Sequence, residues 1–159
     1  GRMLDLLDLP RPGDAEMLRL YEEATAFVTR RVHAAIPGAV AAIRQLRAAG
    51  FVLGTASGEE SFALDGYLSA MGVRDCFAVG LYGPDLVGVL KAGRGYYERV
   101  FADAAVDPAA ARVVDDGREP VAWARTAGAR AIRVGDEIGA LADLPAFLGL
   151  DPGGDGDRE

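Results

Sequence analysis

The sequence predicts an α/β protein built around a parallel sheet, and three observations support this fold class. From Gly38 onward, segments with helical periodicity alternate with short apolar runs, which is typical of βαβ units. Two of these apolar runs end in polar residues, at Ser57 and at Asp115. The chain has 159 residues, and half of them are hydrophobic, so it can bury the core of about one domain.

The order of the elements follows from periodicity and from chain breakers. An amphipathic stretch predicts a first helix, N-capped by Asp14 and ending near His33. Ile36-Pro37-Gly38 breaks the chain, and further helices are expected over 39–49, 59–71, 94–105, 120–127 and 144–148. Strands are expected over 51–55, 76–79, 113–114 and 129–134, with a loop over 80–92. The Gly-rich, acidic tail 151–159 predicts disorder.

Charge and cysteine content narrow the range of partners. The net charge of −7 disfavours a nucleic acid or an anionic membrane surface. The single cysteine, Cys76, rules out an internal disulfide and fits a reducing compartment, so we expect a cytoplasmic protein. No apolar run reaches transmembrane length, and no signal peptide is visible at the start. The oligomeric state is left open.

Two strand ends carry residues suited to phosphate and metal chemistry. Ligands of open α/β sheets lie outside the carboxyl ends of the strands. Ser57 and the backbone N–H of Gly58, at the start of the following helix, can donate to an anion, although Ser57 can equally be a plain N-cap. The carboxylates of Asp115 and Asp116 are hard ligands for Mg²⁺, although two Asp residues also suit a solvated turn.

Lys91 stands out because it is the only lysine, against 16 arginines. A surface position is the usual fate of a lysine, but this composition suggests a specific need for a compact ammonium group. An ammonium group can bridge a carboxylate and a phosphate. Together with Ser57 and the Asp115–Asp116 pair, Lys91 therefore predicts a site where a phosphoryl group and a divalent cation meet.

Six segments of the chain are residues 51–58, 88–91, 96–101, 106–108, 113–117 and 124–132. In order and spacing they resemble the second, third and fourth motifs of the haloacid dehalogenase (HAD) superfamily. The resemblance covers roughly residues 36–135. The resemblance implies a three-layer Rossmann-like core over 37–150, the remnant of a helical cap over 1–36, and Mg²⁺ as cofactor. It also implies hydrolysis of a small phosphorylated substrate through an aspartyl-phosphate, although some members are dehalogenases or phosphomutases.

The resemblance also implies roles for single residues. Ser57 and Gly58 bind the substrate phosphate, Lys91 is both catalytic and substrate-binding, and Asp115 and Asp116 hold the metal ion. Three positions depart from the usual motifs: Gly58 and Pro120, where Asn is frequent, and Ala92, where Pro often follows the lysine.

The family's first motif, a strand running into Asp-x-Asp with the nucleophile, is not found. Asp5 and Asp8 have the wrong spacing and lie too close to Pro10. Either that strand lies upstream of the given sequence, or the protein has diverged, fills the gap with residues 1–10 and lacks a nucleophile. The first alternative predicts a hydrolase when the chain is complete, and the second predicts a catalytically inactive HAD-like binding or scaffold protein. In both cases we expect no phosphatase activity from these 159 residues alone.

Overall fold

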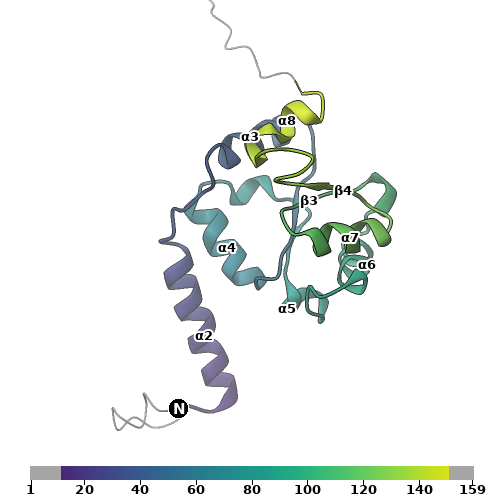
Figure 1. Cartoon of the computed structure of the whole chain (residues 1–159). Coiled ribbons are helices and arrows are strands. Elements are labelled where there is room, and N and C mark those ends of the chain that lie inside the picture. Colours follow the sequence, from purple (N-terminus) through teal and green to yellow (C-terminus); the bar gives the residue numbers. More distant parts are fainter. Residues whose placement is uncertain (1–11, 151–159) are drawn as a thin grey trace, which may run out of the picture.

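The structure is a computed structural model that describes residues 12–150. The predictions for Asp5, Asp8 and the tail 151–159 lie outside the described residues. The first helix, α2 (Asp14–Thr29), extends away from the sheet region and packs along α4 (Ser61–Ala70), as Figure 1 shows. The other helices are α3 (Ala39–Ala48), α5 (Pro84–Val87), α6 (Arg94–Asp103), α7 (Arg118–Thr126) and α8 (Leu144–Phe147).

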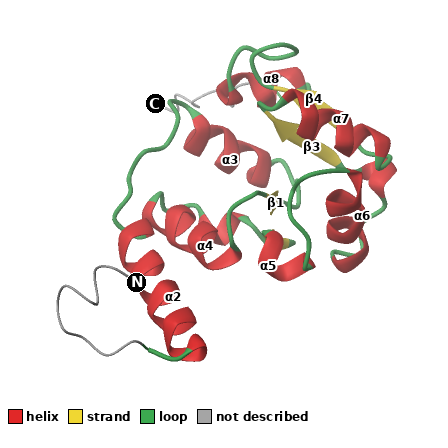
Figure 2. Ribbon diagram, turned by 60° about the horizontal axis from the view of Figure 1, so that its bottom comes forward, coloured by secondary structure: helices red, strands yellow, loops and turns green. Residues whose placement is uncertain are grey.

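The strands form two separate parallel pairs. Strand β1 (Gly54–Ala56) pairs with β2 (Gly80–Tyr82), and β3 (Arg112–Asp115) pairs with β4 (Arg130–Arg133). Among the described residues, β1 and β3 each have a strand on one side only, and Figure 2 shows β1 apart from the ribbons of β3 and β4. Parallel pairs with crossover helices confirm the predicted α/β class.

Both strand pairs lie between the same two helical layers. On one face, Ala56 of β1 and Val113 of β3 pack against a core formed largely by α6 and α7, which includes Tyr97. On the other face, Leu53 and Val114 pack against a core that includes side chains of α3 and α8. Successive strand residues point to opposite faces, so this alternation is the expected result of two covered faces. The predicted three-layer, Rossmann-like architecture is therefore present.

The prediction for residues 76–92 was wrong in two places. Residues 74–76 form a 3-10 helix instead of the start of a strand, and the strand β2 lies at Gly80–Tyr82, inside the predicted loop. Residues of the apolar run 76–79 pack in core clusters, although they are not part of a strand. Their apolar composition alone therefore wrongly indicated a strand. The Gly- and Pro-rich stretch also holds the short helix α5, with Pro84 at its first turn.

Three predicted element ends also differ from the structure. The strand expected over 51–55 is β1, Gly54–Ala56, because β2 offers it a partner only over Gly80–Tyr82. Helix α2 has Gly13 as its N-cap, so Asp14 is the first helical residue. The same helix ends at Thr29, before His33, whose Nδ1 lies 2.9 Å from the carbonyl oxygen of Ala70. No helix between residues 12 and 150 is long and apolar enough to span a membrane.

Candidate active site

The ammonium group of Lys91 lies directly on the acidic end of β3. Its Nζ donates to Oδ2 of Asp115 at 2.6 Å, and the two side chains are 14% and 13% exposed. The other carboxylate oxygen of Asp115 accepts a hydrogen bond from the backbone N–H of Gly117 at 2.8 Å. Both oxygens of Asp115 are thus held by donors, which offsets the cost of keeping this carboxylate mostly out of water. The structure brings together these two of the predicted site residues.

Two adjacent tyrosines of α6 connect this ion pair to the loop after β1. The hydroxyl of Tyr96 lies 2.8 Å from the carbonyl oxygen of Ser57 and 3.1 Å from that of Tyr82. The ring of Tyr97 lies 5.9 Å from Nζ of Lys91 and meets the ring of Tyr96 edge-on at 5.4 Å. Helix α6 therefore supports the Ser57 loop and the Lys91 ammonium group with neighbouring side chains.

Burial changes the acidity of both tyrosines. The hydroxyl of Tyr97 is the one buried side-chain polar atom without a hydrogen-bond partner in the described part of the chain. Burial raises the pKa of Tyr97, and the negative charge of Asp115 adds to this effect. Burial also raises the pKa of Tyr96, whereas its hydrogen bond to Ser57 acts in the opposite direction. Both hydroxyls therefore stay neutral at ordinary pH.

The Ser57 loop differs from the predicted arrangement. Oγ of Ser57 accepts from the backbone N–H of Glu59 at 3.0 Å, but α4 begins only at Ser61, with Glu60 as its N-cap. Ser57 is therefore not the N-cap, and the N–H of Gly58 is not part of the helix N-terminus. The N-terminus of α4 is occupied by Asp85, which accepts from the backbone N–H of Ser61 at 2.9 Å and also from its hydroxyl. This cap comes from 24 positions away, so no local pattern could reveal it.

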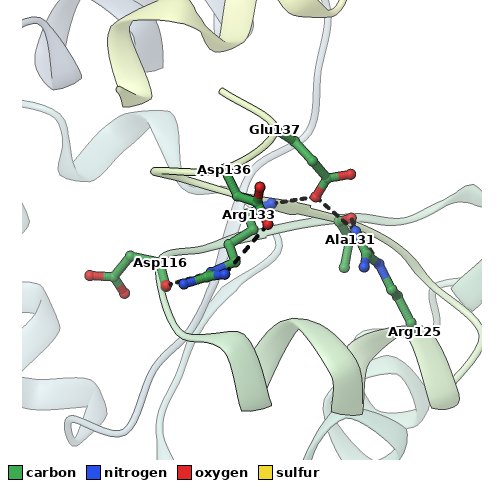
Figure 3. Close-up of polar contacts among 6 residues, drawn as sticks. All are labelled: Asp116, Arg125, Ala131, Arg133, Asp136 and Glu137. Atoms are coloured by element: carbon green, nitrogen blue, oxygen red, sulfur yellow. Dashed lines mark hydrogen bonds and ion pairs between the residues drawn. The ribbon is translucent and has the colours of Figure 1, made fainter. Parts of the chain in front are cut away.

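Asp116 points away from its neighbours. Its side chain is exposed and its carboxylate has no hydrogen-bond or ion-pair partner among residues 12–150. Its backbone carbonyl faces Nε of Arg133 at 3.4 Å, and Figure 3 shows the carboxylate directed to the side opposite that guanidinium group. Sequence reasoning missed Arg133, although the register that pairs Asp115 with Arg133 ends both strands at one edge.

The predicted metal ligands are the two carboxylates of the acidic doublet at the end of β3. Within residues 12–150, no group of three or more histidine, cysteine and acidic side chains is arranged to hold a metal ion. Asp115 and Asp116 follow each other at the carboxyl end of β3, with one carboxylate shared with Lys91 and the other open to solvent. The described residues therefore offer at most two carboxylate ligands at this strand end.

A parallel α/β core with a lysine–carboxylate pair at a strand end defines a protein of the Rossmann-like class. A sequence profile described as haloacid dehalogenase-like hydrolase matches residues 3–128. The chain therefore belongs to the haloacid dehalogenase-like hydrolase family. Among curated proteins, none matches the chain.

The fold agrees with a solved structure of a HAD family hydrolase from Deinococcus radiodurans R1, crystallised with bound phosphate and sodium. The two chains are 23% identical, with a TM-score of 0.58, over 92% of this chain and 71% of the other. At this level of identity the likeness concerns the fold.

Proposed function

We propose that this chain carries the phosphate- and magnesium-binding part of a hydrolase for small phosphorylated substrates. The observation that supports the proposal most directly is the 2.6 Å contact between Lys91 and Asp115 at the carboxyl end of β3. A mostly buried ammonium group keeps further N–H donors beside this carboxylate, and these can offset the charge of a phosphoryl group that binds next to it. The phosphate bound to the Deinococcus radiodurans relative agrees with such a ligand.

Each predicted residue has a chemical role in this proposal. Lys91 stabilises negative charge on the phosphoryl oxygens during transfer. The hydroxyl of Ser57 uses its oxygen to accept from Glu59, so its hydrogen remains available to donate to a phosphoryl oxygen. Gly58 is exposed, and its backbone N–H can donate beside it. The carboxylates of Asp115 and Asp116 are the metal ligands of the proposal.

The donor set fits Mg²⁺. Mg²⁺ is usually held by one or two carboxylates and completes its octahedron with water and substrate oxygens. Asp116 offers a free carboxylate, and Asp115 is fixed by Gly117 in a position that also contacts Lys91. When bound, the ion screens the phosphate charge from an approaching anionic nucleophile.

The carboxylate nucleophile is assigned to a strand outside the described residues, between β1 and β3. The hydrogen bonds from Ser57 to Tyr82 and from Val79 to Leu53 use one edge of β1. In a parallel ladder the alternate residues face the other way, so the backbone groups of Gly54 and Ala56 point away from β2. By the same reasoning, the backbone N–H and C=O groups of Arg112 and Val114 in β3 point away from β4. A parallel strand between these edges would satisfy both and deliver its last residues beside Lys91.

The chemistry would then proceed in two displacements. The carboxylate attacks phosphorus, the ester P–O bond breaks, and the alkoxide leaves and takes up a proton from solvent water. Water then attacks the aspartyl-phosphate at phosphorus, which releases inorganic phosphate and restores the carboxylate. Lys91 and the Ser57 loop would hold the phosphoryl oxygens in both steps.

The alternative is a HAD-like protein that binds phosphorylated compounds without turning them over. It is favoured by the finding that the described residues add no third carboxylate to Asp115 and Asp116. In such a protein, the Lys91–Asp115 pair would serve binding only.

Binding of inorganic phosphate, measured by calorimetry with and without Mg²⁺, tests the site itself. We expect Mg²⁺ to strengthen phosphate binding by about tenfold or more, and Asp116→Asn to remove this gain. Lys91→Met and Ser57→Ala should weaken phosphate binding in both conditions. The assigned site would be refuted if the affinity for phosphate changed neither with Mg²⁺ nor with any of the three substitutions. Magnesium-dependent binding of a phosphate ester without hydrolysis by the natural full-length protein would instead favour the alternative.

A further inference from the structure

A polar hollow lies beside the Asp116 backbone, on the side of Arg133. It is an open groove of about 600 Å³ between α7 and the turn after β4. This volume is within the range of roughly 300–1,000 Å³ that is usual for small-molecule sites. Its charged lining consists of three arginines and two acids, Arg118, Arg125, Arg133, Asp136 and Glu137, and Val121 and Ala122 supply the apolar part. Neither Lys91 nor Asp115 lines it.

One arginine of the groove, Arg125, is held by the fold through two of its guanidinium nitrogens. Both Nε and Nη2 of Arg125 donate to the carbonyl oxygen of Ala131, at 3.2 and 2.7 Å. Nη2 also contacts Oε2 of Glu137 at 2.7 Å, and the same oxygen accepts from the backbone N–H of Arg133 at 2.8 Å. Figure 3 shows this chain of contacts. The charges of Arg125 and Glu137 therefore cancel, and together they fix the wall that carries Arg133.

The other two arginines are not matched in this way. Nη1 of Arg133 lies 3.4 Å from Asp136, whose side chain is 66% exposed. Such a long pair with a solvent-exposed carboxylate adds little to stability, so an incoming anion can displace Asp136. Arg118 is exposed and has no hydrogen bond or ion pair in the part of the chain that the structure describes. In a chain of net charge −7, this groove thus keeps one guanidinium group in excess.

Arg118 and Arg133 both lie near the backbone of Asp116 and both line the groove. Arg118 follows Asp116 by two residues as the first residue of α7, and Nε of Arg133 lies 3.4 Å from the Asp116 carbonyl oxygen. The Asp116 carboxylate points to the opposite side of that backbone from the Arg133 guanidinium group, which keeps its charge away from an anion bound by Arg133 (Figure 3).

We propose that this groove is a second anion site, where Arg118 and Arg133 bind a phosphate or carboxylate group of a small molecule. The planar guanidinium fork matches both groups through paired, charge-assisted hydrogen bonds. The incoming oxyanion displaces Asp136 from Arg133, while Val121 and Ala122 contact the apolar part of the molecule. This site does not depend on the proposed hydrolase function.

The test is an NMR titration of the 159-residue chain at constant ionic strength, with inorganic phosphate in one arm and succinate in the other. We expect the backbone signals of Arg118, Arg133 and Asp136 to shift together. The arm with the tighter binding identifies the preferred oxyanion. Lys91→Met separates this site from the proposed active site, because the shifts in the groove should persist in that variant.

Substitutions give the decisive readout. Arg118→Gln and Arg133→Gln should each weaken binding in the groove by about tenfold. Asp136→Asn should strengthen it, because a competing carboxylate is removed. The matched control is Arg112→Gln, an exposed arginine at the start of β3 that does not line the groove and should leave binding unchanged. The proposal is overturned if neither groove arginine matters more than Arg112, or if every shift depends on Lys91.

Discussion

Lys91 and Asp115 come from segments 24 positions apart and form the least exposed ion pair within residues 12–150, with a distance of 2.6 Å. Removing one partner of such a pair leaves a charge in a site with little access to water. The pair is therefore expected to affect stability as well as ligand binding, which gives a first way to test it.

Lys91→Met should lower the free energy of unfolding by about 2 kcal/mol, because Asp115 would keep only its hydrogen bond from Gly117. Arg94→Met is the matched control. Its pair with Glu98 is exposed (61% and 46%), so its loss should cost about 0.5 kcal/mol or less. Urea unfolding of both variants measures the difference. Equal effects would show that the Lys91–Asp115 contact is an ordinary surface pair.

The two adjacent tyrosines should respond in opposite directions to loss of the hydroxyl. Tyr96→Phe removes contacts to the carbonyls of Ser57 and Tyr82 and should destabilise the chain by about 1–2 kcal/mol. Tyr97→Phe removes a buried hydroxyl without a partner among the described residues and should be neutral or stabilising by up to about 1 kcal/mol. Thermal unfolding of the two variants is sufficient, and a larger loss for Tyr97→Phe would contradict this assignment.

Alkaline pH should destabilise the fold. Burial raises the pKa of Tyr82, Tyr96 and Tyr97 above the usual value of about 10 in the folded chain. Above that pH the unfolded chain loses these protons while the folded chain keeps them, so stability falls as pH rises. Urea unfolding between about pH 8 and pH 11 should show this decline, and Tyr97→Phe should make it shallower. A flat profile would be inconsistent with buried neutral tyrosines.

Gly66 should be essential for the packing of α2 on α4. A Cβ at this position would lie 1.8 Å from Oγ1 of Thr29, which is 3% exposed. Gly66→Ala should therefore cost about 1–3 kcal/mol and make α2 easier to cleave by protease. Gly95→Ala is the control in another helix, where a Cβ meets nothing within 4 Å, and it should be neutral or slightly stabilising. Similar behaviour of both variants would mean that α2 does not pack closely at Thr29.

Local sequence patterns were sufficient for the fold class and for most helices. Periodicity and glycine stops located α3, α6 and α7 within a few residues, because these helices carry an apolar face and a chain breaker at one end. They failed between residues 76 and 92, where tertiary pairing decides which apolar residues become a strand. Gly83 illustrates this, since a Cβ there would lie 2.1 Å from the carbonyl oxygen of Glu59. Gly83 is needed because its backbone lies close to Glu59, which is 24 positions away, so local sequence patterns cannot predict this requirement.

The candidate site was predictable only in part for the same reason. The contact of Lys91 with Asp115 agrees with the expectation that the single lysine meets the acidic doublet at the end of its strand. The capping of α4 by Asp85 and the approach of Arg133 to the Asp116 carbonyl depend on side chains from distant elements. The roles of Ser57, Gly58, Lys91, Asp115 and Asp116 and the division into cap and core stay predictions.

The most direct test of the account is to supply the proposed central strand as a peptide. A designed peptide of about nine residues, with an apolar run followed by Asp-x-Asp-Gly-Thr, would be added to the 159-residue chain with Mg²⁺ and p-nitrophenyl phosphate. We predict no hydrolysis by the chain alone, magnesium-dependent release of p-nitrophenol with the peptide, and none with an Asn-x-Asp control peptide or with Lys91→Met. Tight binding of the peptide without hydrolysis would contradict the hydrolase assignment, and absence of binding would contradict the strand position between β1 and β3.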